Sequence, residues 1–247
     1  MMNEKITEKL TTIAENQPRV YDNGYTKGVR DGVASGYDRF WDGFQNFGSR
    51  TYYDKGFQYW GSEYIEPKYK IVPTSQVSYL FADNENLKAL YAKDFDLGSV
   101  PKSTTWNASY YALCRDCKAL EIFEDINIQP NNAVGYMFMG CTNLKKVEKL
   151  RVDENTVFNG TFHQCPSLEE VWIDGVIASK GDNNNWVSFH YSPNLKKECV
   201  LQVFGCLKDF STTGETASIG LHEKTVSNLT DAEKAIATQK GWTISIR

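Results

Sequence analysis

Two sets of side chains in this sequence have types and spacings that could support chemistry. Cys114 and Cys117 form a Cys-x-x-Cys pair, a spacing typical of redox-active thiols and of zinc sites. Zinc needs four ligands, however, and no second close cysteine or histidine pair follows. His163 and His190 each come directly after a phenylalanine, so they are expected on one face, as binding residues or as ordinary members of a repeat. No hydrolase, nucleotide-binding or metalloprotease motif accompanies them, and the sequence therefore predicts no enzyme activity, cofactor or metal.

The cysteines have a simpler explanation in an internal repeat. Five segments begin at residues 81, 114, 138, 162 and 189, in steps of 33, 24, 24 and 27, and share Leu six residues on. The repeat predicts a buried ladder of Phe81, Leu87, Cys117, Leu120, Phe138, Cys141, Leu144, Phe162, Cys165, Leu168, Phe189 and Leu195. Burial as small apolar groups then explains the cysteines better than metal or redox chemistry. Cys141→Ser is expected to cost roughly 1–3 kcal/mol, because the buried hydroxyl is predicted to have no partner.

Repeats of this length predict a stack of units. One unit has too few apolar residues to close its own core, so like residues of neighbouring units must bury one another. One short strand per unit is expected to pair in parallel with the next, and 24 residues suffice for the crossover between parallel strands. The expected strands lie near residues 87–92, 122–128, 147–152 and 171–177. The fold class that follows is an α/β solenoid of about five repeats with parallel strands.

One unit of the repeat also resembles a known family. Residues Met137–Leu144 read MFMGCTNL and resemble the M-F-x-x-C-x-x-L form of the BspA-like leucine-rich repeats of bacterial surface proteins. The resemblance covers residues 73–198, although the first and last units replace the cysteine by Asn84 and Ser192. It implies a leucine-rich-repeat solenoid that serves as a recognition scaffold rather than as an enzyme.

Residues 199–247 are expected to form an α/β cap, because a solenoid must cover its last apolar face. Apolar spacing predicts a helix over residues 194–210, and a strand is expected over residues 217–221. The boundary between the solenoid and the cap is therefore placed at residue 198.

A second helix and a final strand complete the expected cap. Thr230 and Glu233 have the spacing of a capping box, and Gly241 ends the helix before a strand over residues 242–246. Residues 229–243 also resemble the C-terminal end of repeat proteins encoded by gut phages and prophages.

Residues 1–72 are rich in glycine and aromatic residues. A four-residue stripe of glycines runs beside a second stripe, and the two comprise Gly24, Gly28, Gly32, Gly36, Tyr25, Val29 and Val33. In a helix, each glycine costs roughly 0.8–1 kcal/mol relative to alanine, a cost that close packing against another helix would offset. The region is thus predicted to be helical and to hold a homo-oligomer, with a trimer favoured; an irregular loop is the alternative. Residues 6–21 and 37–48 resemble the N-terminal region of structural proteins of gut phages and prophages.

An insertion lengthens the step between the fourth and fifth repeats. Insertions in repeat proteins form loops, often on the binding face. Its candidate binding residues are Asp182, Asn183, Asn184, Asn185 and Trp186. Their polar groups offer hydrogen bonds, and the tryptophan offers a platform for a sugar or an apolar patch. A plain turn with a buried tryptophan is the alternative.

Composition narrows the function. A net charge of −4 lacks the basic excess of a nucleic-acid binder. With no run of 18 apolar residues and no secretory signal, the chain is expected to be made in the cytoplasm without inserting into a membrane. The preferred function is a tail-associated phage or prophage virion protein that recognises a protein or glycan surface. The alternatives are an intracellular phage effector that sequesters a host protein or small molecule, and a bacterial surface adhesin.

Overall fold

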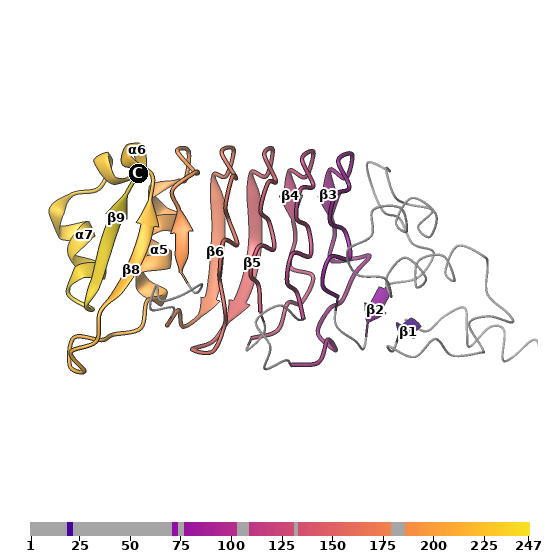
Figure 1. Ribbon diagram of the computed structural model, residues 1–247, viewed down its shortest axis with the longest axis horizontal. Helices are drawn as coiled ribbons and strands as arrows, with labels where there is room; N and C mark the ends of the chain where they lie inside the picture. Colours follow the sequence, from indigo (N-terminus) through magenta and orange to yellow (C-terminus); the bar gives the residue numbers. More distant parts are fainter. Residues whose placement is uncertain (1–18, 22–70, 74–76, 103–108, 131–132, 179–185) are drawn as a thin grey trace, which may run out of the picture.

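The computed structural model describes residues 19–21, 71–73, 77–102, 109–130, 133–178 and 186–247. In this part of the chain the strands pair in parallel, in sheets of two, four and three strands. The two-stranded sheet joins β1 (Arg19–Tyr21) to β2 (Ile71–Pro73). Figure 1 shows β3 to β9 side by side in one elongated row, in the order of the sequence. The protein therefore belongs to the α/β class with parallel strands.

The four-stranded sheet follows the spacing of the sequence repeat. Its strands are β3 (Ala89–Leu90), β4 (Ile122–Phe123), β5 (Lys146–Val152) and β6 (Glu170–Gly175). Ala89 pairs with Ile122, Ile122 with Lys146, and Lys146 with Glu170, which reproduces the steps of 33, 24 and 24 residues. The predicted positions and parallel pairing of these strands are confirmed.

A second ladder of backbone hydrogen bonds joins the same units along their turn segments. The N–H groups of residues 77, 79, 81 and 83 donate to the carbonyls of residues 109, 111, 113 and 115, and the next two junctions repeat the pattern. In each of the first four units, two residues four apart have a positive φ: Tyr79 and Asp83, Ala112 and Asp116, Tyr136 and Gly140, Gly160 and Gln164. This left-handed conformation is costly for most of these residue types. The conformation occurs at the same two positions of each of these turns, and the backbone hydrogen bonds between units hold the turns in place.

The predicted ladder residues form the core. None of the twelve is more than 6% exposed. The rings of Phe138, Phe162 and Phe189 stack at centroid distances of 5.7 and 4.9 Å. The sulfur atoms of Cys117 and Cys141 donate to the carbonyls of Phe81 and Cys114 at 2.9 and 3.0 Å. The cysteine ladder is therefore buried as predicted, and its thiols are free.

The C-terminal segment forms the three-stranded sheet and three helices. The elements are β7 (Val187–Phe189), α5 (Lys197–Cys206), β8 (Ala217–Leu221), α6 (Glu223–Ser227), α7 (Asp231–Thr238) and β9 (Trp242–Ile246). Strands β8 and β9 have the predicted bounds, and Thr230 and Glu233 form the predicted capping box at the start of α7.

Two features of this segment differ from the prediction. The helix predicted over residues 194–210 ends at Cys206, because Leu207 is extended and forms a parallel bridge with Ile177. Strand β7 ends at Phe189, the first residue of the fifth repeat, so it aligns with the turn segments of the other units rather than with β6, and it pairs with β8. In the fifth unit the position equivalent to β6 is occupied by α5, which packs against β6.

Two sets of predicted residues lie outside the described part of the chain. They are the N-terminal stripes, with Gly24, Gly28, Gly32 and Gly36, and the insertion residues 182–185. Among the helices that are described, none has both the length and the apolar character needed to cross a membrane.

Candidate functional site

An open pocket of about 340 Å³ lies where the fourth unit meets the three-stranded sheet. It is lined by His163, Trp186, Val187, Ser188, His190, Tyr191, Ser218, Gly220, Ser245 and Arg247. The structure thus brings together His163, His190 and Trp186, the three candidate binding residues that it describes. Its volume is at the small end of the range for ligand pockets, roughly 300–1,000 Å³.

The pocket lies where the stack changes its pairing. The N–H groups of residues 136, 138 and 140 donate to the fourth unit. Among the described residues, the equivalent groups at 160, 162 and 164 make no such bond to residues 186–191. Strand β7 turns instead to β8, although the Phe162 and Phe189 rings stay stacked in the core. The apolar core therefore continues from the fourth unit into the three-stranded sheet, while the backbone hydrogen bonds above it stop and leave room for the pocket.

The floor of the pocket is a row of small residues across three strands. Ser188 on β7 pairs with Gly220 on β8, which pairs with Ser245 on β9. The His190 ring crosses this row, and its Nε2 donates to the Ser245 carbonyl at 3.0 Å. A carbonyl can only accept, so Nε2 carries the hydrogen and Nδ1 of the neutral ring remains an acceptor.

Gly220 is what lets the histidine ring lie there. A Cβ atom at residue 220 would lie 2.7 Å from Cε1 and 2.8 Å from Nε2 of His190, closer than carbon and nitrogen atoms can pack. Any larger residue at this position would therefore displace the imidazole from the floor.

One wall of the pocket consists of His163, Tyr191 and Arg247. The His163 ring meets the Tyr191 ring edge to face at a centroid distance of 4.6 Å. The Arg247 guanidinium lies 4.9 Å from the centre of the Tyr191 ring, and its Nη1 donates to the tyrosine Oη at 2.7 Å. Burial, and then the charge of Arg247, lowers the pKa of His163. Both effects favour the neutral form of His163, while Arg247 supplies a positive charge.

Trp186 is 38% exposed, immediately before β7. The alternative prediction of a buried tryptophan in a plain turn is therefore wrong with respect to burial. Its ring is partly open to solvent beside the pocket, where it can stack on a flat apolar surface. The four polar residues before it lie outside the described residues, so the prediction for them is not tested by the structure.

Comparison of this chain with protein-family models, curated proteins and solved structures finds no match. What the pocket can bind must therefore be inferred from its own geometry.

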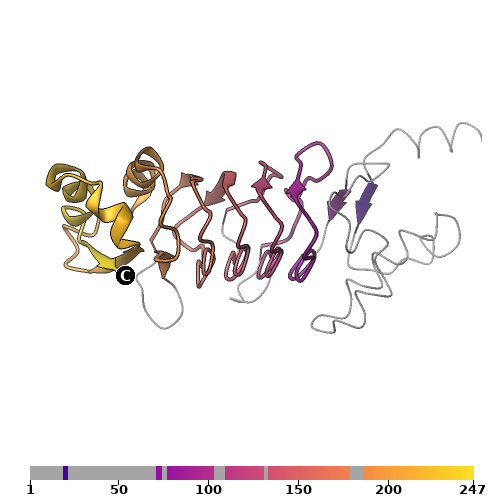
Figure 2. The same ribbon diagram turned by 90° about the horizontal axis from the view of Figure 1, so that it is seen from above.

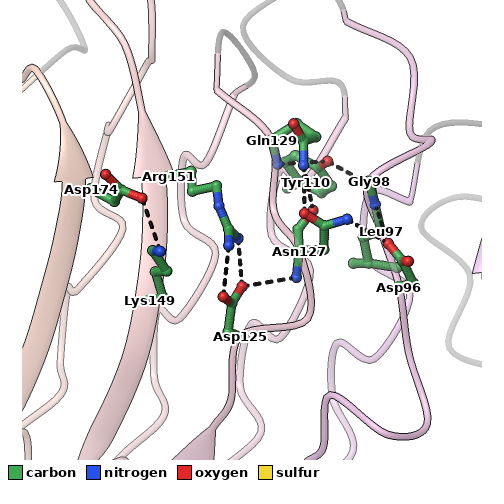
Figure 3. Close-up of polar contacts among 10 residues, drawn as sticks. All are labelled: Asp96, Leu97, Gly98, Tyr110, Asp125, Asn127, Gln129, Lys149, Arg151 and Asp174. Carbon is green, nitrogen blue, oxygen red and sulfur yellow. Dashed lines mark hydrogen bonds and ion pairs between the residues drawn. The ribbon is translucent and has the colours of Figure 1, made fainter.

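A second polar cluster crosses the units near β4 and β5, and Figure 3 shows its residues. Arg151 donates through both terminal nitrogens to Asp125, one bond being 2.7 Å long. Asn127 donates to Asp96 at 2.7 Å and accepts from Gln129 at 2.6 Å. These groups satisfy one another, so the cluster joins neighbouring units rather than offering open groups to a ligand.

The Cys114–Cys117 pair has no reactive character in the structure. Both thiols are free and fully buried. Burial raises the pKa of Cys114 well above its usual value, which disfavours the nucleophilic thiolate. In the described part of the chain, no group of three or more His, Cys, Asp or Glu residues is arranged to hold a metal ion.

Several residues of the pocket were not identified from the sequence, chiefly Tyr191, Arg247 and Gly220. One signal was present, because Ser218, Gly220 and Ser245 alternate with apolar residues in the two predicted strands. Such alternation indicates a sheet with one polar face. The contact of Arg247 with Tyr191, 56 residues away, had no local signal.

Proposed function

We propose that this protein is a non-enzymatic recognition module built on a BspA-like leucine-rich-repeat solenoid of about five repeats. The regular 24-residue register of β4, β5 and β6 supports this, as does the ladder of buried phenylalanine, cysteine and leucine residues. Residues 199–247 then cap the solenoid, with helices α5 and α7 beside the last strands (Figure 2).

The pocket above β7, β8 and β9 is the proposed binding site, and its ligand is a saccharide on a host surface. The observation that carries this is the combination of a partly exposed Trp186 ring with a floor of serine hydroxyls. A sugar has flat C–H faces that stack on an aromatic ring and hydroxyls that exchange hydrogen bonds with serine and histidine. A lipid or other fully apolar ligand would leave these polar groups unpaired.

Binding without catalysis suits the arrangement of the histidines. His190 directs Nε2 to a backbone carbonyl, and no Asp or Glu is among the residues that line the pocket. A general acid and base pair of the kind that cleaves glycosidic bonds uses two carboxyl groups. The pocket is therefore proposed to hold a saccharide intact.

The proposed setting is a tail-associated protein of a phage or prophage virion. The resemblance of residues 6–21, 37–48 and 229–243 to phage and prophage proteins supports it. Residues 1–72 would hold a trimer through the glycine stripe, and light scattering of Gly28→Leu with Gly32→Leu tests that role. A folded monomer is expected for this variant, whereas a wild-type monomer at micromolar concentration would contradict it. An intracellular phage effector and a bacterial surface adhesin are the other proposed settings.

An array of immobilised saccharides tests the binding function. Trp186→Ala should lose about fivefold or more in affinity, since stacking on an aromatic ring supplies on the order of 1 kcal/mol or more. Trp172→Ala is the matched control, because Trp172 on β6 is 36% exposed and outside the pocket. Retention of no saccharide, with capture of a host surface protein through Trp186, would replace the saccharide by a protein ligand. Equal effects of both variants would remove the pocket as the binding site.

A further inference from the structure

The charge of the pocket specifies the ligand beyond a generic saccharide, an inference that rests on the proposed function. Arg247 is the only Lys or Arg among the lining residues, none of which is Asp or Glu. In the described residues, Arg247 forms no ion pair, and its one side-chain hydrogen bond goes to the neutral Tyr191 hydroxyl. A guanidinium has five N–H donors, so most of those of Arg247 remain open to a ligand.

The guanidinium is also held in place before any ligand arrives. It lies on the Tyr191 ring and donates to its hydroxyl, and Tyr191 is itself in contact with His163. An arginine ordered in this way loses less side-chain entropy on binding than a free one. Its planar fork matches a carboxylate, a sulfate or a phosphate. A cationic ligand would meet the like charge of Arg247 at the same place.

We propose that the pocket selects a saccharide unit that carries an anionic group, with that group paired to Arg247 and the sugar ring against Trp186. The small floor of Ser188, Gly220 and Ser245 leaves room for the ring above the sheet. His190, held through Nε2, presents Nδ1 as an acceptor for a sugar hydroxyl. The sugar ring thus contacts uncharged polar groups, and the anionic group of the ligand pairs with Arg247, the only Lys, Arg, Asp or Glu among the lining residues.

Titration of the full-length protein with a matched set of sugars tests this. The probes are glucose, glucuronic acid, glucose 6-sulfate, glucose 6-phosphate and inorganic sulfate alone. At least one of the three anionic sugars should bind about tenfold more tightly than glucose, and which one does identifies the anionic group. Raising sodium chloride from 50 to 500 mM should reduce that preference, because salt screens partly exposed charges.

Two variants assign the preference to the guanidinium. Arg247→Gln should bind glucose and the anionic sugars equally, whereas Tyr191→Phe, which only removes the hydroxyl that orders the arginine, should lose part of the preference. Lys234→Gln is the control, since Lys234 on α7 pairs with Asp231 away from the pocket. All three variants are first checked for wild-type unfolding midpoints, and if Arg247→Gln is unfolded, the Tyr191→Phe result decides.

The possible failures are separable. Equal binding of glucose and of all three anionic sugars, still abolished by Trp186→Ala, overturns the anionic ligand but leaves saccharide recognition intact. Inorganic sulfate binding as tightly as glucose 6-sulfate overturns the sugar-specific inference, because the ring would then contribute nothing. An unchanged preference in both Arg247→Gln and Tyr191→Phe overturns the assignment to Arg247. Absence of binding to every sugar overturns the proposed saccharide function together with this inference.

Discussion

The four-stranded and three-stranded sheets use the same parallel pairing but present different outer faces. The outer face of β4 to β6 carries long side chains: Ile122 and Trp172 are partly exposed, and Lys149 on β5 pairs with Asp174 on β6. On β7 to β9 the face beneath the pocket carries Ser188, Gly220 and Ser245, which are small and uncharged. Long side chains cover the first sheet, whereas short ones leave space above the second.

This difference shows how a repeating protein can separate stability from binding. Neighbouring repeat units join their backbone polar groups through strands and turn ladders, and ion pairs join charged side chains of one unit to the next. Such groups have little left to offer a ligand. The pocket arises where the repetition stops and His163, at the end of the stack, has Tyr191 and Arg247 as neighbours.

The largest expected difference in the free energy of unfolding is between a substitution in the core of the repeats and one in the pocket. Phe138→Ala removes a fully buried ring between Phe123 and Phe162 and should cost about 3–5 kcal/mol in the free energy of unfolding. Trp186→Ala removes a partly exposed ring and should cost less than about 1 kcal/mol. Urea unfolding followed by circular dichroism measures both. Similar losses would mean that the pocket is part of the core.

A pair of glycine substitutions sharpens the contrast within the C-terminal region. Gly220→Val would drive the His190 ring from the floor and should cost about 1–3 kcal/mol while abolishing saccharide binding. Gly205 in α5 has open space around its Cβ position, so Gly205→Ala should stabilise the protein by roughly 0.5–1 kcal/mol and leave binding unchanged. Unfolding curves and sugar titrations on both variants provide the test. Normal binding by Gly220→Val would show that the ring position is irrelevant.

Cys141 in the repeats and Cys206 in α5 should differ in thiol reactivity, and Cys141 should tolerate replacement by serine. The prediction that the hydroxyl of Cys141→Ser lacks a partner is wrong, because the Cys114 carbonyl already accepts from residue 141. Ser192, at the equivalent position of the fifth unit, also donates to a backbone carbonyl, that of Cys165. The cost should therefore be about 1 kcal/mol or less, near the net value of one hydrogen bond. Half-buried Cys206 should react with a thiol reagent well before Cys141, which mass spectrometry of the native protein can follow. Earlier labelling of Cys141 would contradict the buried ladder.

Acid should weaken the stack through Asp125. The hydrogen bond from Arg151 lowers the pKa of this carboxyl in the folded protein. The pair therefore stabilises the fold above the unfolded pKa of about 3.9, and the contribution is lost as the pH falls through the lower folded value. Arg151→Met should cost about 0.5–1 kcal/mol at pH 7, and the difference from wild type should shrink below pH 3. Urea unfolding at both pH values measures it; a constant difference would contradict the ion pair.

The smallest expected effect on stability comes from His163 in the pocket, where folding favours the neutral form of the side chain rather than the charged form. Because burial and Arg247 lower the pKa of His163, the folded protein binds this proton less readily than the unfolded chain does. Stability should then decline as the pH falls below about 6.5, the unfolded value. His163→Gln should reduce that decline between pH 7 and pH 5 in thermal unfolding. An identical pH profile would show that His163 does not titrate in this range.

The sequence alone determined the features that depend on local spacing. The steps of 33, 24 and 24 residues predict which strands pair, because a fixed offset places like residues in register. The capping box of Thr230 and Glu233 is read directly from two positions, since both of its hydrogen bonds are local. The buried ladder follows because each unit needs its neighbour to exclude water.

Only the tertiary structure decided where the repetition ends and what surrounds that point. Strand β7 pairs with β8, and α5 ends before Leu207, which forms a bridge with Ile177. Both contacts join residues about 30 positions apart in the sequence. The pocket brings His163, on a turn, close to Arg247, which follows β9. Residue 220 must be a glycine because the imidazole ring of His190, directly after β7, lies against it. Local periodicity carries no information on such contacts, because they depend on which surfaces meet once the chain has packed.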